Sequence, residues 1–154
     1  MNILNFSITI NATPEHVWDT MLSDATYRIW TTEFNPGSYY EGDWSEGSKI
    51  VFLGPDPKNP EVMGGMVGTV AESRRPEFVS IRYSGLISNG VEDTSSPEVQ
   101  SWVGATESYR FSPVEGGTEV LVEMTMVSDE FAGYMNDTWP KALQALKQLS
   151  EKSE

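Results

Sequence analysis

The middle of this 154-residue chain repeats one pattern, in which short stretches of alternating apolar and polar residues are separated by turn residues. Such alternation places successive side chains on opposite faces and predicts half-buried β-strands. Six strands are predicted, at residues 38–44, 49–53, 65–72, 78–84, 101–112 and 118–127. The pair Gly116-Gly117 before the last strand is the clearest hairpin signal, because glycine takes the positive φ angles of tight turns. Six strands in succession predict an antiparallel meander.

Another strand and two short helices are predicted before this meander. Residues 3–10 alternate with a period of two and predict a strand. Thr13 then supplies an N-cap hydroxyl and Pro14 suits a first helical turn, so a helix is predicted to begin at Pro14. A second short helix is predicted at residues 24–30. The buried face of the first helix is expected to consist of Val17, Trp18, Met21 and Leu22.

After the meander the pattern becomes helical. Residues 129–135 predict a short helical turn, and a long helix is predicted to run from about 138 to 151. We expect Pro140 to mark the first turn of this helix, where proline is tolerated. The inner stripe is predicted to be Trp139, Leu143 and Leu146, and the outer face Lys141, Gln144, Gln148 and Lys152. The polar stretch at residues 88–97 has no periodicity and is interpreted as an exposed, mobile insertion.

Composition restricts the partners and the chemistry. The length predicts one domain, residues 1–154, and the net charge of −13 argues against a nucleic-acid partner. The absence of cysteine excludes thiol catalysis and disulfides. The amino-terminal sequence has neither a basic start nor a long apolar run, so we expect no signal peptide and no membrane span, and a cytoplasmic location.

Few residues could support metal or acid–base chemistry. His16 is the only histidine, and we interpret it as a solvated or capping residue beside the first helix. Oxygen clusters for a cation are conceivable at two turns, but neither has the spacing of a calcium loop, and solvated acids are the simpler interpretation. These acids are Glu41, Asp43, Glu46, Asp56 and Glu61. We expect no metal, no cofactor and no catalytic residue.

Glu107 is the most informative polar residue of the predicted sheet. If Phe111 points inward, as its size demands, the period of two places Tyr109, Glu107, Ala105 and Val103 on the same concave face. A carboxylate there could anchor a ligand, with Tyr109 or Tyr83 beside it. The alternatives are a structural hydrogen bond, or a bulge that turns Glu107 outward.

The order of motifs along the chain resembles a known superfamily. The motifs are TPEHVWDTM, YYEGDWSEGSKIVF, GTV followed by RRPEFVSIRY, YRFSPVEGGTEVLVEM and TWPKALQALKQL. Together they resemble the START-related SRPBCC superfamily, and within it the branch named for the C-terminal domain of the activator of heat-shock-protein-90 ATPase. The resemblance implies an α+β helix-grip fold, in which a curved antiparallel sheet wraps around a long C-terminal helix and leaves a cavity between them.

The same resemblance implies three kinds of function, since members bind lipids, hormones or polyketides, some assist a chaperone, and some are enzymes. Our first hypothesis is a module that binds an apolar or amphipathic small molecule, and the second is an interaction domain that modulates a chaperone ATPase. A small cyclase or hydrolase is the third, but no nucleophile, metal set or cofactor motif supports it. The expected ligand-binding residues are Phe52, Met66, Tyr83, Val103, Glu107, Tyr109, Phe111, Met124, Met135, Trp139 and Leu143.

Overall fold

The computed structural model of the chain describes residues 2–35, 37–56, 59–88, 91–100, 103–127 and 129–152. The helices are α1 (Pro14–Leu22), α2 (Asp24–Trp30), the short 3-10 helix η1 (Thr31–Glu33), α3 (Pro97–Gln100) and α4 (Asp129–Lys152). The strands are β1 (Asn2–Ile10), β2 (Tyr39–Gly42), β3 (Lys49–Asp56), β4 (Asn59–Arg74), β5 (Phe78–Ser88), β6 (Val91–Asp93), β7 (Thr106–Val114) and β8 (Gly117–Val127).

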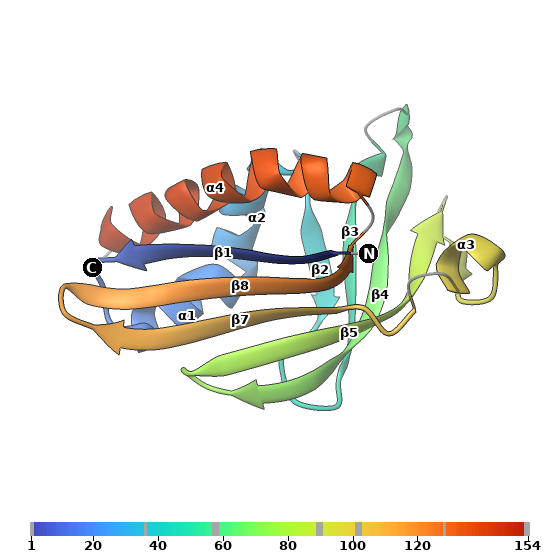
Figure 1. Cartoon of the computed structure of the whole chain (residues 1–154). Helices are drawn as coiled ribbons and strands as arrows, with labels where there is room; N and C mark the ends of the chain where they lie inside the picture. Colours follow the sequence, from blue (N-terminus) through green and yellow to red (C-terminus); the bar gives the residue numbers. More distant parts are fainter. Residues whose placement is uncertain are drawn as a thin grey trace.

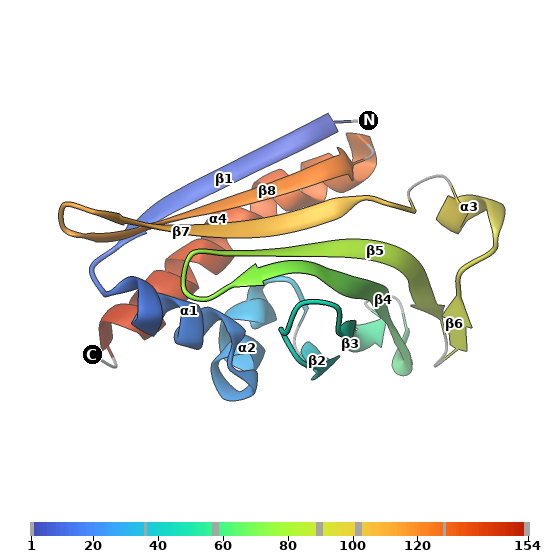
Figure 2. The same cartoon turned by 90° about the horizontal axis from the view of Figure 1, so that it is seen from below.

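The described strands form one curved antiparallel sheet in the order β1-β8-β7-β5-β4-β3-β2, with β6 paired to β5. Helix α4 lies along β1 on one face of this sheet, and β3 and β4 cross its direction at the far end (Figure 1). Helices α1 and α2 lie together near the C-terminal half of α4 (Figure 2). The predicted meander and the α+β helix-grip class are therefore confirmed, and β1 completes the sheet beside β8.

Local signals explain the first two helices. The Thr13 hydroxyl accepts a hydrogen bond from the backbone N–H of His16 at 3.2 Å, and Pro14 opens α1 as predicted. The predicted buried face of α1 is confirmed, and α2 begins and ends at the predicted residues. These helices pack with α4 against the concave face of the sheet, where the core lies. Its most completely buried aliphatic residues include Ile10, Val17, Ile50, Val70, Val79, Ile81, Val120, Val122 and Leu146.

The prediction that Pro140 starts the last helix is wrong. Helix α4 is continuous from Asp129 to Lys152, and Pro140 lies inside it on the exposed side. An interior proline removes one helical hydrogen bond and costs about 3 kcal/mol. The buried stripe of Trp139, Leu143 and Leu146, which is confirmed, holds the helix on the sheet across this position.

Further boundaries differ from the sequence prediction, and β3, β4 and β5 extend beyond their predicted ranges. The insertion at residues 88–97 contains β6, which pairs with β5 at Leu86↔Asp93. This strand was not predicted because it is held by backbone pairing at a sheet edge, which requires no apolar periodicity. The strand predicted at 101–112 begins only at Thr106. Val103 lies in the turn before it, next to Gly104 with φ of 95°, and residues 101–102 lie outside the described residues. No helix in the described part of the chain is long and apolar enough to cross a membrane.

Candidate functional site

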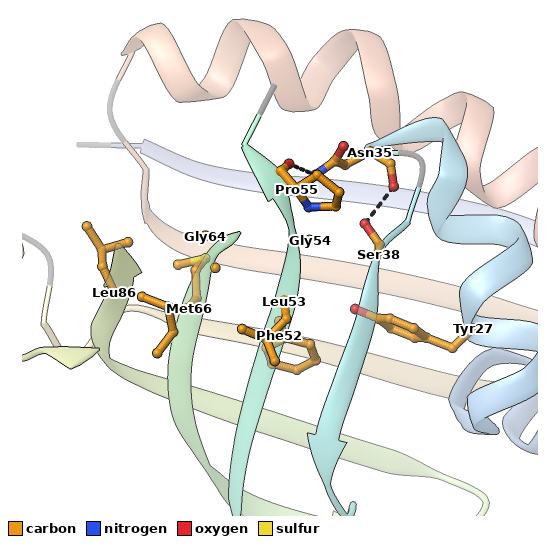
Figure 3. A pocket seen from close by; sticks show the side chains of 12 residues that line it. Tyr27, Asn35, Ser38, Phe52, Leu53, Gly54, Pro55, Gly64, Met66 and Leu86 are labelled. Carbon is orange, nitrogen blue, oxygen red and sulfur yellow. Dashed lines mark hydrogen bonds between the residues drawn. The ribbon is translucent and has the colours of Figure 1, made fainter. Parts of the chain in front are cut away.

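A pocket of about 390 Å³ opens between the ends of β3, β4 and β5 and the segment that follows η1. Figure 3 shows Leu86 and Met66 on one side of it, Tyr27 on the opposite side, and Phe52 between them. The described lining contains no charged side chain and consists of Tyr27, Asn35, Ser38, Phe52, Leu53, Gly54, Pro55, Gly64, Gly65, Met66, Leu86 and Ile87. Its walls are therefore uncharged and combine apolar side chains with a comparable share of polar surface.

The segment after η1 is fastened to β3 at one side of the pocket. The Asn35 amide nitrogen donates to the backbone oxygen of Pro55 at 2.6 Å, and the Ser38 hydroxyl donates to the backbone oxygen of Asn35 at 2.8 Å (Figure 3). A β-carbon on Gly54 would lie 2.7 Å from the Asn35 side-chain nitrogen, so glycine permits this close approach. The side chains of Asn35 and Ser38 thus use their donor groups to hold the pocket wall.

Tyr27 brings a phenol to the pocket from α2. Its ring is buried and meets the Tyr40 ring edge-on, with centroids 5.0 Å apart, and the Trp30 ring at 5.4 Å. In Figure 3 its hydroxyl points away from α2, toward β2 and β3. Burial, followed by the negative charges of Glu107 and Tyr40 when ionised, raises the pKa of the Tyr27 phenol far above its ordinary value. The hydroxyl therefore keeps its proton at neutral pH.

Glu107 lies at the centre of a buried hydrogen-bonded cluster next to the pocket. It is only 7% exposed, and its Oε2 accepts hydrogen bonds from Tyr83 at 2.6 Å and from Tyr109 at 3.1 Å. Register places Glu107 opposite Met124 on β8 and Ile81 on β5, so it points into the core as the alternation predicts. The Tyr83 ring lies 6.2 Å from the ring of Phe52, which connects this cluster to the pocket wall.

Burial dominates the electrostatics of this cluster. It raises the pKa of the Glu107 carboxyl, whereas the hydrogen bonds from the two tyrosines lower it. The pKa values of Tyr83 and Tyr109 are raised by burial and by the charge of Glu107. Arg82 and Arg110 flank the same region of the sheet but are exposed, and the structure records no contact of either with Glu107. The two phenols are thus the groups that stabilise the carboxyl.

The protein-family model described as "Activator of Hsp90 ATPase homolog 1-like protein" matches residues 11–151, nearly the whole chain. The chain belongs to this family. The predicted relation to the activator branch of the SRPBCC superfamily is confirmed by this match. A search of the curated proteins finds no match.

Solved structures of similar proteins share the fold of this family member. The solution structure of the Aha1 dimer from Colwellia psychrerythraea is 24% identical, with 98% of this chain and 97% of that chain covered and a TM-score of 0.72. A Rhodobacter sphaeroides protein is 21% identical, with 99% and 93% covered and a TM-score of 0.70. A Mesorhizobium loti protein is 13% identical, with 99% of both chains covered and a TM-score of 0.72. At these identities the likeness establishes the helix-grip fold.

The structure distributes the eleven residues predicted to bind a ligand over four places. Phe52 and Met66 line the pocket, while Tyr83, Glu107 and Tyr109 form the buried cluster beside it. Val103 is 36% exposed in its turn, because β7 starts later than predicted, so its assignment to the concave strand face is wrong. The remaining five are buried in the core, outside the described pocket lining: Phe111, Met124, Met135, Trp139 and Leu143.

Trp139 shows why the expected space under α4 is not where this pocket lies. It is 2% exposed, and its ring lies within 5.0 Å of Phe34 and 5.8 Å of Trp30, measured between centroids. The rings of Tyr109, at 6.0 Å, and Phe6, at 6.3 Å, complete this aromatic cluster. None of these rings belongs to the described pocket lining, which comes mainly from β3, β4 and β5.

Most of the pocket lining was not expected from the sequence. Asn35 and Ser38 lie outside regular elements and Pro55 lies near the end of β3, so their meeting depends on tertiary structure. Tyr27 had a usable signal, because it lies three residues before Trp30 on the buried face of α2. Leu86 was missed because β5 continues to Ser88, beyond the predicted end at residue 84.

Two of the other polar candidates, His16 and Asp43, have structural partners. His16 Nε2 lies 2.9 Å from the backbone oxygen of Ser150, so this histidine joins α1 to the end of α4. Asp43 Oδ1 accepts hydrogen bonds from the Ser45 N–H at 2.7 Å and the Ser48 hydroxyl at 2.9 Å, which organises a turn. Among the described residues no group of three or more histidine, aspartate and glutamate side chains could hold a metal ion.

Proposed function

We propose that this protein binds an apolar or amphipathic small molecule in the pocket between β3, β4, β5 and the residues Asn35 and Ser38. The observation that carries this proposal is a hollow of about 390 Å³ whose described lining has no charged side chain and includes the apolar side chains of Phe52, Leu53, Met66, Leu86 and Ile87. Small-molecule sites typically have volumes of about 300–1,000 Å³ and combine such walls with a few placed polar groups. The family to which the chain belongs supports the same class of function.

The pocket wall is anchored, which favours a preformed site. Asn35 holds the segment after η1 on β3, and Tyr134 of α4 donates a hydrogen bond to the backbone oxygen of Phe34 at 2.6 Å. The same segment is thus attached to the sheet on one side and to α4 on the other. Less ordering on binding leaves more of the contact energy for affinity.

Filling the pocket tests the proposal. A β-carbon on Gly64 would meet only the backbone oxygen of Ile87, at 3.6 Å, so the substitution Gly64→Leu should fold and project its side chain into the pocket. We expect it to weaken binding of the uncharged dye Nile red at least about tenfold, measured by fluorescence titration. Ala71→Leu, on an exposed position of the same strand, is the matched control and should bind like the wild type. Equal dye affinity for all three proteins contradicts a site in this pocket.

A second candidate function is modulation of a chaperone ATPase, and the family match over residues 11–151 favours it. In this role the protein would contact an Hsp90-type chaperone through its surface. The test is the steady-state ATP hydrolysis rate of a bacterial Hsp90 titrated with this protein. Stimulation that is retained by Gly64→Leu supports a surface interaction independent of the pocket, and an unchanged rate with wild-type protein removes this candidate.

A further inference from the structure

The hydroxyl of Tyr27 lies at the pocket without a hydrogen-bond partner among the residues the structure describes. Tyr27 as a whole is only 8% exposed, and its hydroxyl oxygen remains accessible at the pocket. Other buried or half-buried phenols are satisfied: Tyr40 donates to the Leu22 backbone oxygen at 2.5 Å, and Tyr83 and Tyr109 donate to Glu107. A phenol that opens onto the pocket and has no protein partner can donate its hydrogen bond to a ligand there.

Of the other polar side chains of the described lining, Ser38 has its one donor occupied and Asn35 has one of its two N–H donors occupied. Asn35 donates to Pro55, and Ser38 donates to the backbone of Asn35. Tyr27 is therefore the side chain of this lining that has an O–H available for a ligand, and it stays protonated because burial and the nearby Glu107 oppose its ionisation. The chemistry on offer is neutral, with the O–H of Tyr27 and the remaining N–H of Asn35 as donors in an open pocket whose lining has both polar and apolar surface.

The described pocket lining has no side chain of opposite charge to pair with a charged group of a ligand. The described lining contains neither a cation for a carboxylate nor a carboxylate for an ammonium group. Glu107, the nearby buried acid, is already bound by two phenols, and its charge and the net charge of −13 oppose an anion. Burying an unpaired charge is strongly unfavourable, so a charged head group should be rejected.

We propose that the pocket selects an uncharged amphipathic molecule with an acceptor oxygen, such as a ketone, ester or ether, that accepts a hydrogen bond from the Tyr27 hydroxyl. This inference rests on the proposed small-molecule function and adds to it the chemical class of the ligand. It assigns Tyr27 as the residue that recognises the oxygen, and the apolar side chains of Phe52, Met66 and Leu86 as contacts for the hydrocarbon part.

Three naphthalene derivatives of similar size provide the test. 2-Acetylnaphthalene carries an acceptor oxygen, 2-ethylnaphthalene lacks it, and 2-naphthoate carries a charge near neutral pH. Their dissociation constants would be measured by fluorescence for the wild type, Tyr27→Phe and Tyr40→Phe. Tyr40→Phe is the matched control, because it removes a hydroxyl that bonds the protein backbone and lies outside the described lining.

We expect the wild type to bind the ketone about threefold to tenfold more tightly than the ethyl compound, and the carboxylate at least about tenfold more weakly than the ketone. In Tyr27→Phe the preference for the ketone should fall to about one or below, because the oxygen would be buried without a donor, while Tyr40→Phe keeps it. The affinity ratio within one protein is insensitive to partial unfolding of a variant.

The outcomes separate this inference from the function on which it rests. Binding of 2-ethylnaphthalene without any preference for the ketone, or a preference that survives Tyr27→Phe, overturns the role of Tyr27 and leaves the pocket standing. Tighter binding of 2-naphthoate than of the ketone overturns the selection for uncharged ligands. Failure of all three probes to bind the wild type removes both this inference and the small-molecule function.

Discussion

Truncation of Trp139 should be among the most destabilising single changes in this protein. Its indole lies between α4 and the sheet, 2% exposed, with four aromatic rings at centroid distances of 5.0 to 6.3 Å. Trp139→Ala would leave a void bordered by stiff rings that cannot collapse into it. Removal of a large buried aromatic costs about 3–5 kcal/mol, and we expect about 4–5 kcal/mol here because the surroundings are rigid. This is a large part of a typical domain stability of about 5–15 kcal/mol.

Trp139→Phe should behave differently, because the indole N–H of Trp139 itself destabilises the folded state. Nε1 of Trp139 is buried and has no hydrogen-bond partner within the described part of the chain. An unsatisfied buried donor costs about 1–3 kcal/mol, and phenylalanine removes it while keeping one ring in the cluster. The loss of apolar contact and the loss of the unpaired N–H therefore oppose each other, and we expect a net destabilisation below about 2 kcal/mol.

Urea unfolding followed by circular dichroism measures both changes, with Lys141→Ala on the exposed face of α4 as the control. The reasoning requires a large loss for alanine, a small loss for phenylalanine and little change for the control. If Trp139→Ala lies within about 1 kcal/mol of the wild type, the indole does not hold α4 on the sheet. If phenylalanine is as damaging as alanine, the unpaired N–H does not carry the assigned cost.

Two further predictions concern the sheet. Burial raises the pKa of Glu107 above its ordinary value of 4.5, so the folded state holds this proton more tightly than the unfolded state. Its contribution to stability is therefore full at low pH and is lost as pH rises through the folded pKa. In urea titrations from about pH 4 to pH 8, Glu107→Gln should not show this decrease in the free energy of unfolding. If the free energy of unfolding changes with pH in the same way for the wild type and the variant, the assignment is contradicted. Gly65→Ala would put a β-carbon 1.8 Å from the Phe52 backbone oxygen and should lower the free energy of unfolding by more than about 2 kcal/mol. By contrast, Gly133→Ala, on α4 with open space around it, should raise that free energy by about 0.5–1 kcal/mol, and equal effects at the two glycines would refute the steric argument.

Local patterning accounts for what could be predicted from the sequence. The cap at Thr13, the bounds of α2 and the stripe of Trp139, Leu143 and Leu146 depend on residues close together in the chain. The inward orientation of Glu107 and its partnership with Tyr109 follow from the same period of two. These features require only that each segment adopt its preferred periodic structure, so the order of motifs was enough to identify the family.

Tertiary structure decided the features that depend on how those segments meet. Helix α4 runs through Pro140 because burial of its inner face outweighs the lost hydrogen bond, which no local signal records. The pocket exists because curvature of the sheet brings the ends of β3, β4 and β5 to the segment after η1, with Asn35 bonded to Pro55 twenty residues away. The availability of the Tyr27 hydroxyl also depends on tertiary structure. Whether a phenol has a partner is decided by neighbours from distant parts of the chain and not by its own spacing along α2.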